Sequence, residues 1–122
     1  MRRRVVITGM GCITPLGHDP ESLWAACLRG DSGIRPNELF DASTYPTTFA
    51  AQVRDFELPE SIARGGLHEH AGRHTRFALA AARQAWAQAG LDADGAADPD
   101  RTGVYLGSGE GRLDFDNFTS LL

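Results

Sequence analysis

The chain has 122 residues, of which 42% are hydrophobic and 23% charged, and its formal net charge is −4. This composition excludes a disordered or fibrous chain, and an acidic chain whose only basic run is 2–4 is not expected to bind nucleic acid. No run approaches the roughly 20 apolar residues of a membrane span. The apolar residues after the arginines stop at Thr8 without a signal-peptide cleavage site, so we expect a cytoplasmic protein with no membrane partner.

The first predicted element is a short strand over residues 4–7. Its run of β-branched residues, without polar alternation, predicts burial on both faces. Gly9-Met10-Gly11 follows this strand as in a dinucleotide-binding fingerprint. However, Thr14 occupies the third glycine position and no helix begins at once, so nucleotide binding is disfavoured.

A helix is predicted next, from local signals that agree. Asp19 is placed to cap its first turn, Pro20 occupies the first helical position, and Gly30 supplies the stop. Leu23 and Cys27 share one apolar face of this helix. Residues 31–67 mix prolines with scattered apolar anchors, and only 49–53 indicates a short strand.

The clearest helix is predicted over residues 75–89. Apolar residues recur every four positions, and the many alanines allow a neighbouring backbone to approach closely. Polar residues, Gln84 and Gln88 among them, fall on one side. The pattern predicts burial around much of the helix, which needs more surrounding protein than 122 residues easily provide.

A second buried strand is predicted over residues 102–106. The order strand, helix, helix, strand predicts a parallel pair with a right-handed crossover, and hence the α/β class. Apolar residues recur at helical spacing over 115–122, and the chain then stops without a cap. We therefore expect the sequence to be cut short.

The sequence gives little support for a metal site or for a reactive thiol. Cys12 and Cys27 do not make a disulfide framework, and both are expected to be small buried hydrophobic residues. His68, His70 and His74 include a pair at zinc-ligand spacing, but Gly72 weakens a helix there and nothing completes the site. We expect no metal and no cofactor.

Several segments, taken in order, resemble the opening of β-ketoacyl-[acyl-carrier-protein] synthases of the thiolase superfamily. The resemblance covers essentially the whole chain. It rests on Val5-Val6-Ile7-Thr8-Gly9-Met10-Gly11 with Thr14-Pro15-Leu16-Gly17, Leu23-Trp24 with Gly30-Asp31-Ser32-Gly33-Ile34, Phe40-Asp41 with Phe49-Ala50, Arg76-Phe77-Ala78-Leu79-Ala80-Ala81-Ala82 with Ala89-Gly90-Leu91, and Arg101-Thr102-Gly103-Val104 with Gly107-Ser108-Gly109. It implies a partial thiolase-like layered α/β fold, with residues 1–122 forming the N-terminal part of the synthase N-domain.

The resemblance also implies a decarboxylating condensation in fatty acid or polyketide synthesis. In this family a cysteine takes an acyl chain from acyl carrier protein, and malonyl carrier protein then loses CO₂ with the help of two histidines. Those residues lie beyond the end of this chain, so no catalytic residue is assigned and the chain alone is expected to be inactive. The implied partners are acyl- and malonyl-loaded carrier protein and a second subunit, in a homodimer or a heterodimer.

One family feature can be carried over onto residues of this chain. The loop Gly107, Ser108, Gly109, Glu110 and Gly111 matches a glycine loop that lies near the acyl pocket and the dimer interface in the family. Glu110 stands where the family usually has an apolar residue, and Arg112 stands where it usually has glycine. A carboxylate in an acyl tunnel is costly unless paired or solvated, so we expect Glu110 to face water or to pair.

Two other functions stay open from the sequence. The first is a non-catalytic, chain-length-factor-like subunit, which shares the fold without the cysteine and which Glu110 slightly favours. The second is a free-standing small binding module, which the uncapped apolar end and the buried second helix disfavour.

Overall fold

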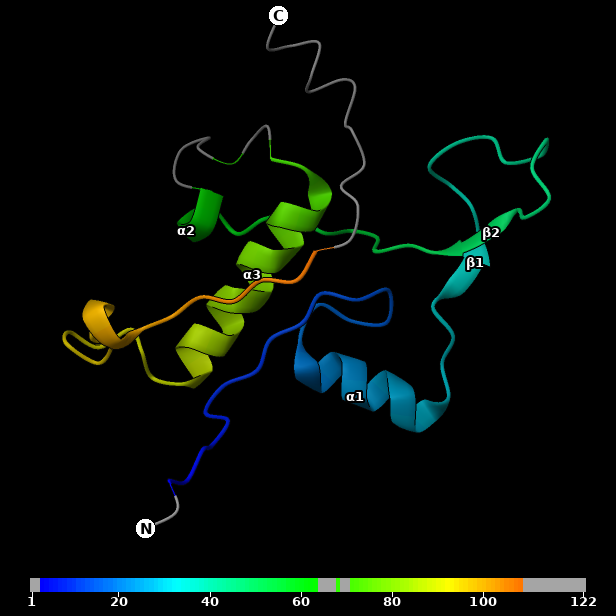
Figure 1. Ribbon diagram of the computed structural model, residues 1–122. Coiled ribbons are helices and arrows are strands. Elements are labelled where there is room, and N and C mark those ends of the chain that lie inside the picture. The colour runs from blue at the N-terminus through cyan, green and yellow to red at the C-terminus, as the bar shows by residue number, and fades with distance from the viewer. Residues whose placement is uncertain (1–2, 64–67, 69–70, 109–122) are drawn as a thin grey trace, which may run out of the picture.

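The computed structural model describes residues 3–63, 68 and 71–108. Figure 1 shows α3 at the centre, with the N-terminal segment and α1 beside its lower half and the β1–β2 hairpin standing apart. In chain order the elements are α1 (Pro20–Arg29), β1 (Ile34–Pro36), β2 (Phe49–Ala51), α2 (Glu60–Ala63), α3 (Arg73–Gln88) and a 3₁₀ turn over Pro99–Arg101.

Helix α1 forms as its local signals predict. The Asp19 carboxylate accepts a hydrogen bond from the Ser22 backbone N–H at 2.8 Å, and Pro20 is the first helical residue. Gly30 ends the helix with φ 72°, a left-handed conformation that glycine adopts without strain, and its N–H bonds to the Cys27 carbonyl at 3.1 Å. The prediction of this helix, with its cap and its stop, is confirmed.

Helix α3 begins two residues before its predicted start and ends one residue before its predicted end. Its alanine face lies directly against the N-terminal segment. A Cβ built on Gly9 would overlap the Ala85 carbonyl oxygen, and one built on Gly11 would overlap that of Ala81. The predicted close approach of a neighbouring backbone to this helix is therefore confirmed.

The two strands predicted at 4–7 and 102–106 are not formed, so the parallel pair is a wrong prediction for the described residues. Both segments run extended but without a strand partner, and Val5 and Tyr105 are 91% and 96% exposed. A β-strand requires a neighbour for its backbone hydrogen bonds, and the described residues offer none to either segment.

The sheet that does form in the described part of the chain is small and antiparallel. It pairs β1 with β2 in the register Ile34↔Ala51 and Pro36↔Phe49. The strand predicted at 49–53 is thus confirmed over its first three residues. The layered α/β fold is present only in part.

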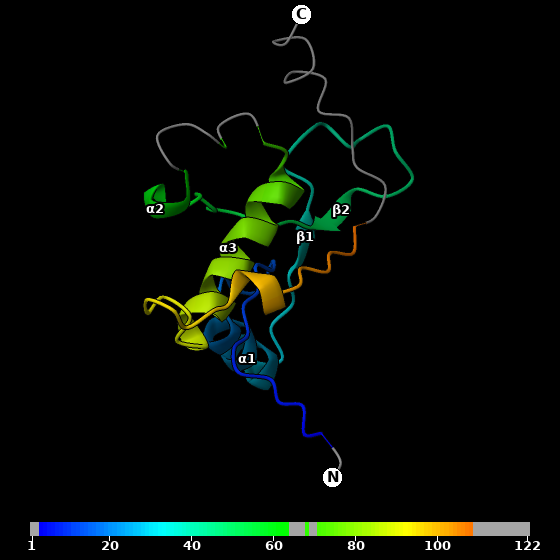
Figure 2. The same ribbon diagram turned by 60° about the vertical axis from the view of Figure 1, so that its left-hand side comes forward.

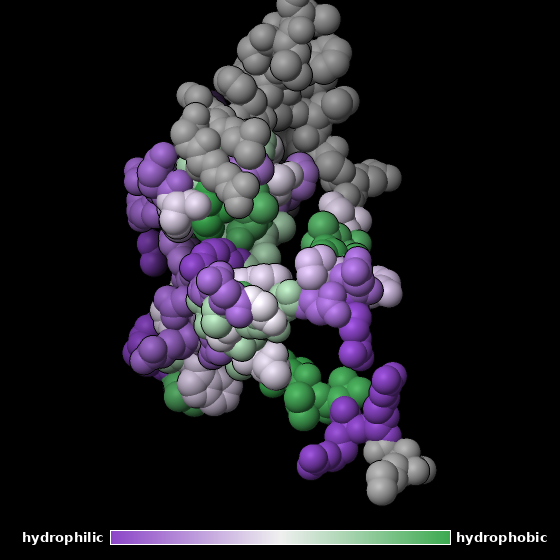
Figure 3. Space-filling view, turned by 90° about the vertical axis from the view of Figure 1, so that its left-hand side faces the viewer, coloured by the Kyte–Doolittle hydropathy of each residue, from purple (hydrophilic) through white to green (hydrophobic). Residues whose placement is uncertain are grey.

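The buried apolar side chains of the described residues are three alanines, Ala26, Ala42 and Ala80. The expected burial of α3 around much of its circumference is wrong here, because few described segments pack on it. Figure 3 shows hydrophobic side chains at the surface beside hydrophilic ones. No helix in the described ranges is long and apolar enough to cross a membrane.

Candidate functional site

The predicted glycine loop lies at the end of the described chain. Gly107 and Ser108 are exposed, and a Cβ added at Gly107 would meet nothing within 4 Å. Gly109, Glu110 and Gly111 lie outside the described residues, so the surroundings predicted for this loop remain a prediction.

Two glutamines of α3 hold the backbone of the N-terminal segment. The Met10 N–H donates to Gln88 Oε1 at 2.6 Å, and the Cys12 N–H donates to Gln84 Oε1 at 3.1 Å. Gln84 Nε2 in turn donates to the His18 carbonyl at 2.6 Å. Gln84 therefore ties both ends of the loop 12–18 to one point on the helix. In Figure 2 the N-terminal part of the chain, in blue, lies beside the lower half of α3.

Sequence reasoning missed this contact. It placed Gln84 and Gln88 on the polar side of the helix, without a partner for either. Two amides four residues apart lie on one face of a helix, and this face also carries Ala81 and Ala85, which contact the glycines. The position of the two glutamines beside these alanines was the available signal. A glutamine side chain next to a closely packed backbone can bond to the N–H and C=O groups of that backbone.

A line of rings joins the loop 12–18 to the start of α3. The His18 and Phe56 rings meet edge to face at 5.7 Å, and Phe56 and Phe77 do so at 5.0 Å. The Arg73 guanidinium lies 5.2 Å from the centroid of the Phe77 ring and donates to the Val53 carbonyl at 2.7 Å. Three segments distant in sequence are thus fixed together around Phe56.

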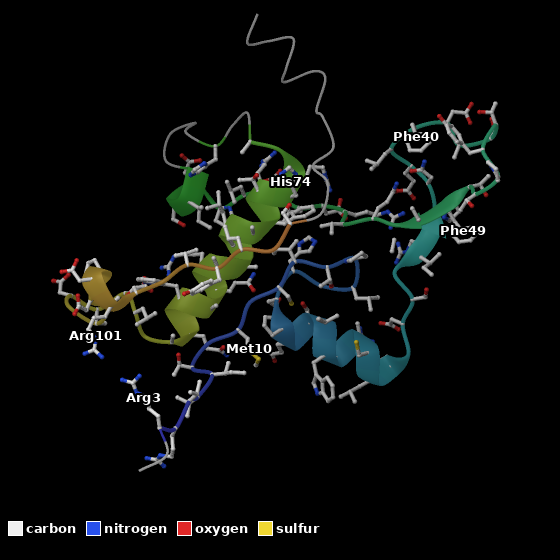
Figure 4. All side chains as sticks on the ribbon, in the orientation of Figure 1. Arg3, Met10, Phe40, Phe49, His74 and Arg101 are labelled. Atoms are coloured by element: carbon white, nitrogen blue, oxygen red, sulfur yellow. The ribbon has the colours of Figure 1, made fainter. Side chains whose placement is uncertain are left out.

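An apolar cavity of about 910 Å³ opens between residues 9–12 and α1. Figure 4 labels Met10 on its wall, which also includes Trp24 and both cysteines. Burial, and to a lesser extent the negative charge of Asp19, raises the pKa of the Cys12 thiol. Cys12 therefore stays protonated near neutral pH and is not an activated nucleophile.

The expectation that both cysteines are buried is only partly met. Cys12 is half-buried but Cys27 is exposed, although both line the cavity between residues 9–12 and α1. Neither cysteine has a histidine among the neighbours that line the cavity with it.

A second, polar cavity of about 450 Å³ lies between the loop 15–19 and the segments that carry Arg35 and Arg54. Arg54 is paired with Glu38 at 2.9 Å, and Asp55 on the cavity wall has φ 52°, which is uncommon for a residue other than glycine. No metal-binding cluster occurs among the residues that the structure describes. His70, which with His74 has the spacing of zinc ligands, lies outside those residues.

Comparisons with known proteins identify relatives along the whole chain. The sequence profile described as "Beta-ketoacyl synthase, N-terminal domain" matches residues 2–121. The chain is 42% identical over 123 residues to 3-oxoacyl-[acyl-carrier-protein] synthase 2 of Coxiella burnetii, covering 99% of this chain and 29% of that protein. It is 39% identical over 114 residues to the granaticin polyketide putative β-ketoacyl synthase 2 of Streptomyces violaceoruber, covering 93% of this chain and 27% of that protein.

A solved structure, the ishigamide ketosynthase/chain length factor, is also similar. It superposes with a TM-score of 0.65 at 41% identity, over 75% of this chain and 22% of that chain. The chain thus spans less than a third of the length of the curated relatives named above.

Proposed function

Because this chain belongs to the β-ketoacyl synthase family, to whose N-terminal domain residues 2–121 correspond, we propose that it is part of a 3-oxoacyl-[acyl-carrier-protein] synthase. Such an acyltransferase condenses an acyl thioester with malonyl carrier protein in fatty acid or polyketide synthesis. The observation that carries the proposal is 42% identity to a relative of that name over 99% of this chain.

The proposed condensation requires no cofactor. An acyl group moves from its carrier thioester to an enzyme cysteine, which releases the carrier thiol. Malonyl thioester then loses CO₂, and the carbon left with the electron pair attacks the acyl-enzyme. The new carbon–carbon bond forms as the cysteine leaves, while backbone N–H donors stabilise the oxyanion.

In this proposal residues 3–108 form scaffold rather than catalytic machinery. Cys12 is a protonated thiol, and Cys27 is exposed on a helix without a histidine among its cavity neighbours. The nucleophile and the two histidines would come from outside this chain. Carrier protein and a second synthase subunit, identical or not, are the proposed partners.

Residues 107–111 are proposed to lie near the acyl pocket and the subunit interface, with Glu110 facing water or paired. The test is Glu110→Ile in a full-length synthase that carries residues 1–122. If Glu110 is solvated or paired, acceptance of long acyl chains changes less than about threefold. A rise of about tenfold or more would place the carboxylate in the tunnel, because that is the direction expected when a buried charge is removed.

The decisive experiment is a chimera of the Coxiella burnetii relative in which the segment matched by this chain is replaced with residues 1–122. We expect it to form 3-oxoacyl product from acyl and malonyl carrier protein at a rate within about tenfold of the unmodified relative. Residues 1–122 alone should form none. A chimera that unfolds cooperatively but makes no product contradicts the proposal.

A non-catalytic chain-length-factor-like subunit is the second candidate. Glu110 favours it, and the similarity to a ketosynthase/chain length factor at 41% identity is compatible with either function. The residue at the nucleophile position of the complete polypeptide separates the two functions. A cysteine there supports the synthase, and any other residue supports the non-catalytic subunit.

A further inference from the structure

We propose that the polar cavity between the loop 15–19 and the segments that carry Arg35 and Arg54 binds a small zwitterion, a molecule with one cationic and one anionic group. We call this cavity the β1 cavity and define it by the aspartates and arginines of its wall, which are Asp19, Arg35, Arg54 and Asp55. The inference goes beyond the condensation proposed above and does not depend on it.

Two of these four charged side chains already have partners within the chain. The Arg54 guanidinium donates to Glu38 Oε2 at 2.9 Å and to the Pro36 carbonyl at 3.4 Å. The Asp19 carboxylate accepts a hydrogen bond from the Ser22 backbone N–H at 2.8 Å, where it caps α1. The Glu38 carboxylate therefore compensates the charge of Arg54, and the first N–H groups of α1 compensate that of Asp19.

The other two charged side chains line the cavity without such a partner. Neither Arg35 nor Asp55 makes a side-chain hydrogen bond or an ion pair with any residue that the structure describes. They do not pair with each other either, although both belong to the wall of one cavity. A guanidinium and a carboxylate held apart in this way are complementary to a ligand that carries charges of both signs.

The backbone sets the position of both unpartnered side chains. In β1, Arg35 is paired with Ala50 and lies on the opposite face of the hairpin from Ile34 and Pro36. Asp55 has φ 52°, a left-handed conformation that is uncommon for residues other than glycine and that is concentrated at ligand sites. The strand thus holds the cationic part of the wall, and the backbone at Asp55 holds the anionic part.

The size and polarity of the β1 cavity restrict the ligand to a small polar molecule. Its volume of about 450 Å³ is near the lower end of the range for small-molecule sites. A guanidinium binds a carboxylate through paired N–H donors, and a carboxylate binds an ammonium group, so an amino acid has the required chemistry. Arg35 and Asp55 are both exposed, so solvent weakens each contact, and half-saturation is expected at about 1–10 mM.

A ligand with a single charge fits the β1 cavity less well. An anion beside Arg35 would be repelled by the carboxylate of Asp55, and a cation beside Asp55 would be repelled by the guanidinium of Arg35. A zwitterion compensates both charges at once. The matched probes are therefore 4-aminobutyrate, butyrate and butylammonium, which share a four-carbon chain and differ in their charged groups.

The test is saturation-transfer difference NMR on a full-length synthase that carries residues 1–122, with the three probes at equal ionic strength. We expect saturable binding of 4-aminobutyrate, at least about fivefold tighter than that of either other probe. Arg35→Gln and Asp55→Asn should each weaken this binding at least about fivefold, and should shift the melting temperature by less than about 2 °C because both residues are exposed. The control Arg29→Gln, at an exposed ion pair outside the cavity, should change the binding less than about twofold.

Three results would overturn the proposal. The first is the absence of saturable 4-aminobutyrate binding. The second is binding that neither Arg35→Gln nor Asp55→Asn weakens, which would place the ligand elsewhere on the protein. The third is butyrate or butylammonium binding as tightly as 4-aminobutyrate, which would make the β1 cavity a site for a simple anion or a simple cation. The comparison of the three probes uses the parent protein, so it is decisive even where a substitution alters folding.

Discussion

Gly9 packs onto the main chain of Ala85 so closely that a Cβ on Gly9 would stand 3.0 Å from the Ala85 carbonyl carbon and would overlap its oxygen. Gly11 has the same relationship with Ala81, one helical turn away. The glycines that follow the first extended segment are thus explained by helix packing. This contact supplies a physical reason for their spacing that involves no nucleotide.

The first prediction concerns this contact. Gly9→Ala should destabilise the chain by about 3 kcal/mol, because a methyl group pressed against helix backbone forces the segment 9–12 away from α3. Urea denaturation followed by circular dichroism measures the change. The control is Gly107→Ala, where an added Cβ meets nothing within 4 Å, and its effect should stay below about 0.5 kcal/mol. Equal effects of the two substitutions would contradict the packing.

The second prediction concerns Gln84. Gln84→Leu removes the acceptor for the Cys12 N–H and the donor to the His18 carbonyl, and should cost about 2 kcal/mol. Hydrogen exchange at the Cys12 amide should accelerate at least about tenfold. Gln84→Glu keeps the acceptor but loses the donor, so it should retain most of the protection at Cys12. Protection that is identical in all three proteins would argue against the bridge.

Local signals and long-range contacts differed in how far the sequence could predict them. Asp19, Pro20 and Gly30 predicted α1 correctly, because a cap, a first-turn proline and a left-handed glycine act within a few residues of one another. The contact of Gln84 with His18 spans 66 positions, and no local pattern specifies such a pairing.

The prediction of two strands was wrong for a related reason. The composition of 4–7 and 102–106 favours strands, but a strand exists only when a neighbour accepts and donates its hydrogen bonds. The four-residue period of α3 predicted the helix itself, and its alanines predicted the close approach of Gly9. The described residues leave its remaining faces largely uncovered, with Ala80 as the buried residue of the helix.

The third prediction concerns the Asp19 cap and pH. The hydrogen bond from the Ser22 backbone N–H, aided by the Ser22 side chain, lowers the pKa of the Asp19 carboxyl. A group whose pKa is lower in the folded chain stabilises it above the unfolded value of about 3.9, and that stabilisation is lost as the pH falls through the folded pKa. Asp19→Ala should cost about 1 kcal/mol at pH 7 and less at about pH 3.

Asp19→Asn is the matched control for this prediction, because it keeps the capping acceptor without a titrating carboxyl. Urea midpoints at about pH 3 and pH 7 measure both variants against the parent chain. The difference in stability between the Asp19→Asn variant and the parent should shrink at low pH. A cost of Asp19→Ala that is the same at both pH values would contradict the linkage.

The final prediction concerns the two thiols of the isolated chain. Burial and the charge of Asp19 raise the pKa of Cys12, so a smaller fraction of it is thiolate at any given pH. Its alkylation rate should reach half of its maximum above about pH 8.5, where a cysteine in an unstructured peptide titrates. Cys27 is exposed, so near neutral pH it should react at least about tenfold faster than Cys12.

Asp19→Asn removes the charge, keeps the cap, and should shift the Cys12 profile to lower pH. Since burial is the larger cause, most of the rise in pKa should persist in this variant. A Cys12 profile centred at or below about pH 8.5 in the parent chain would contradict the half-buried thiol of the structure.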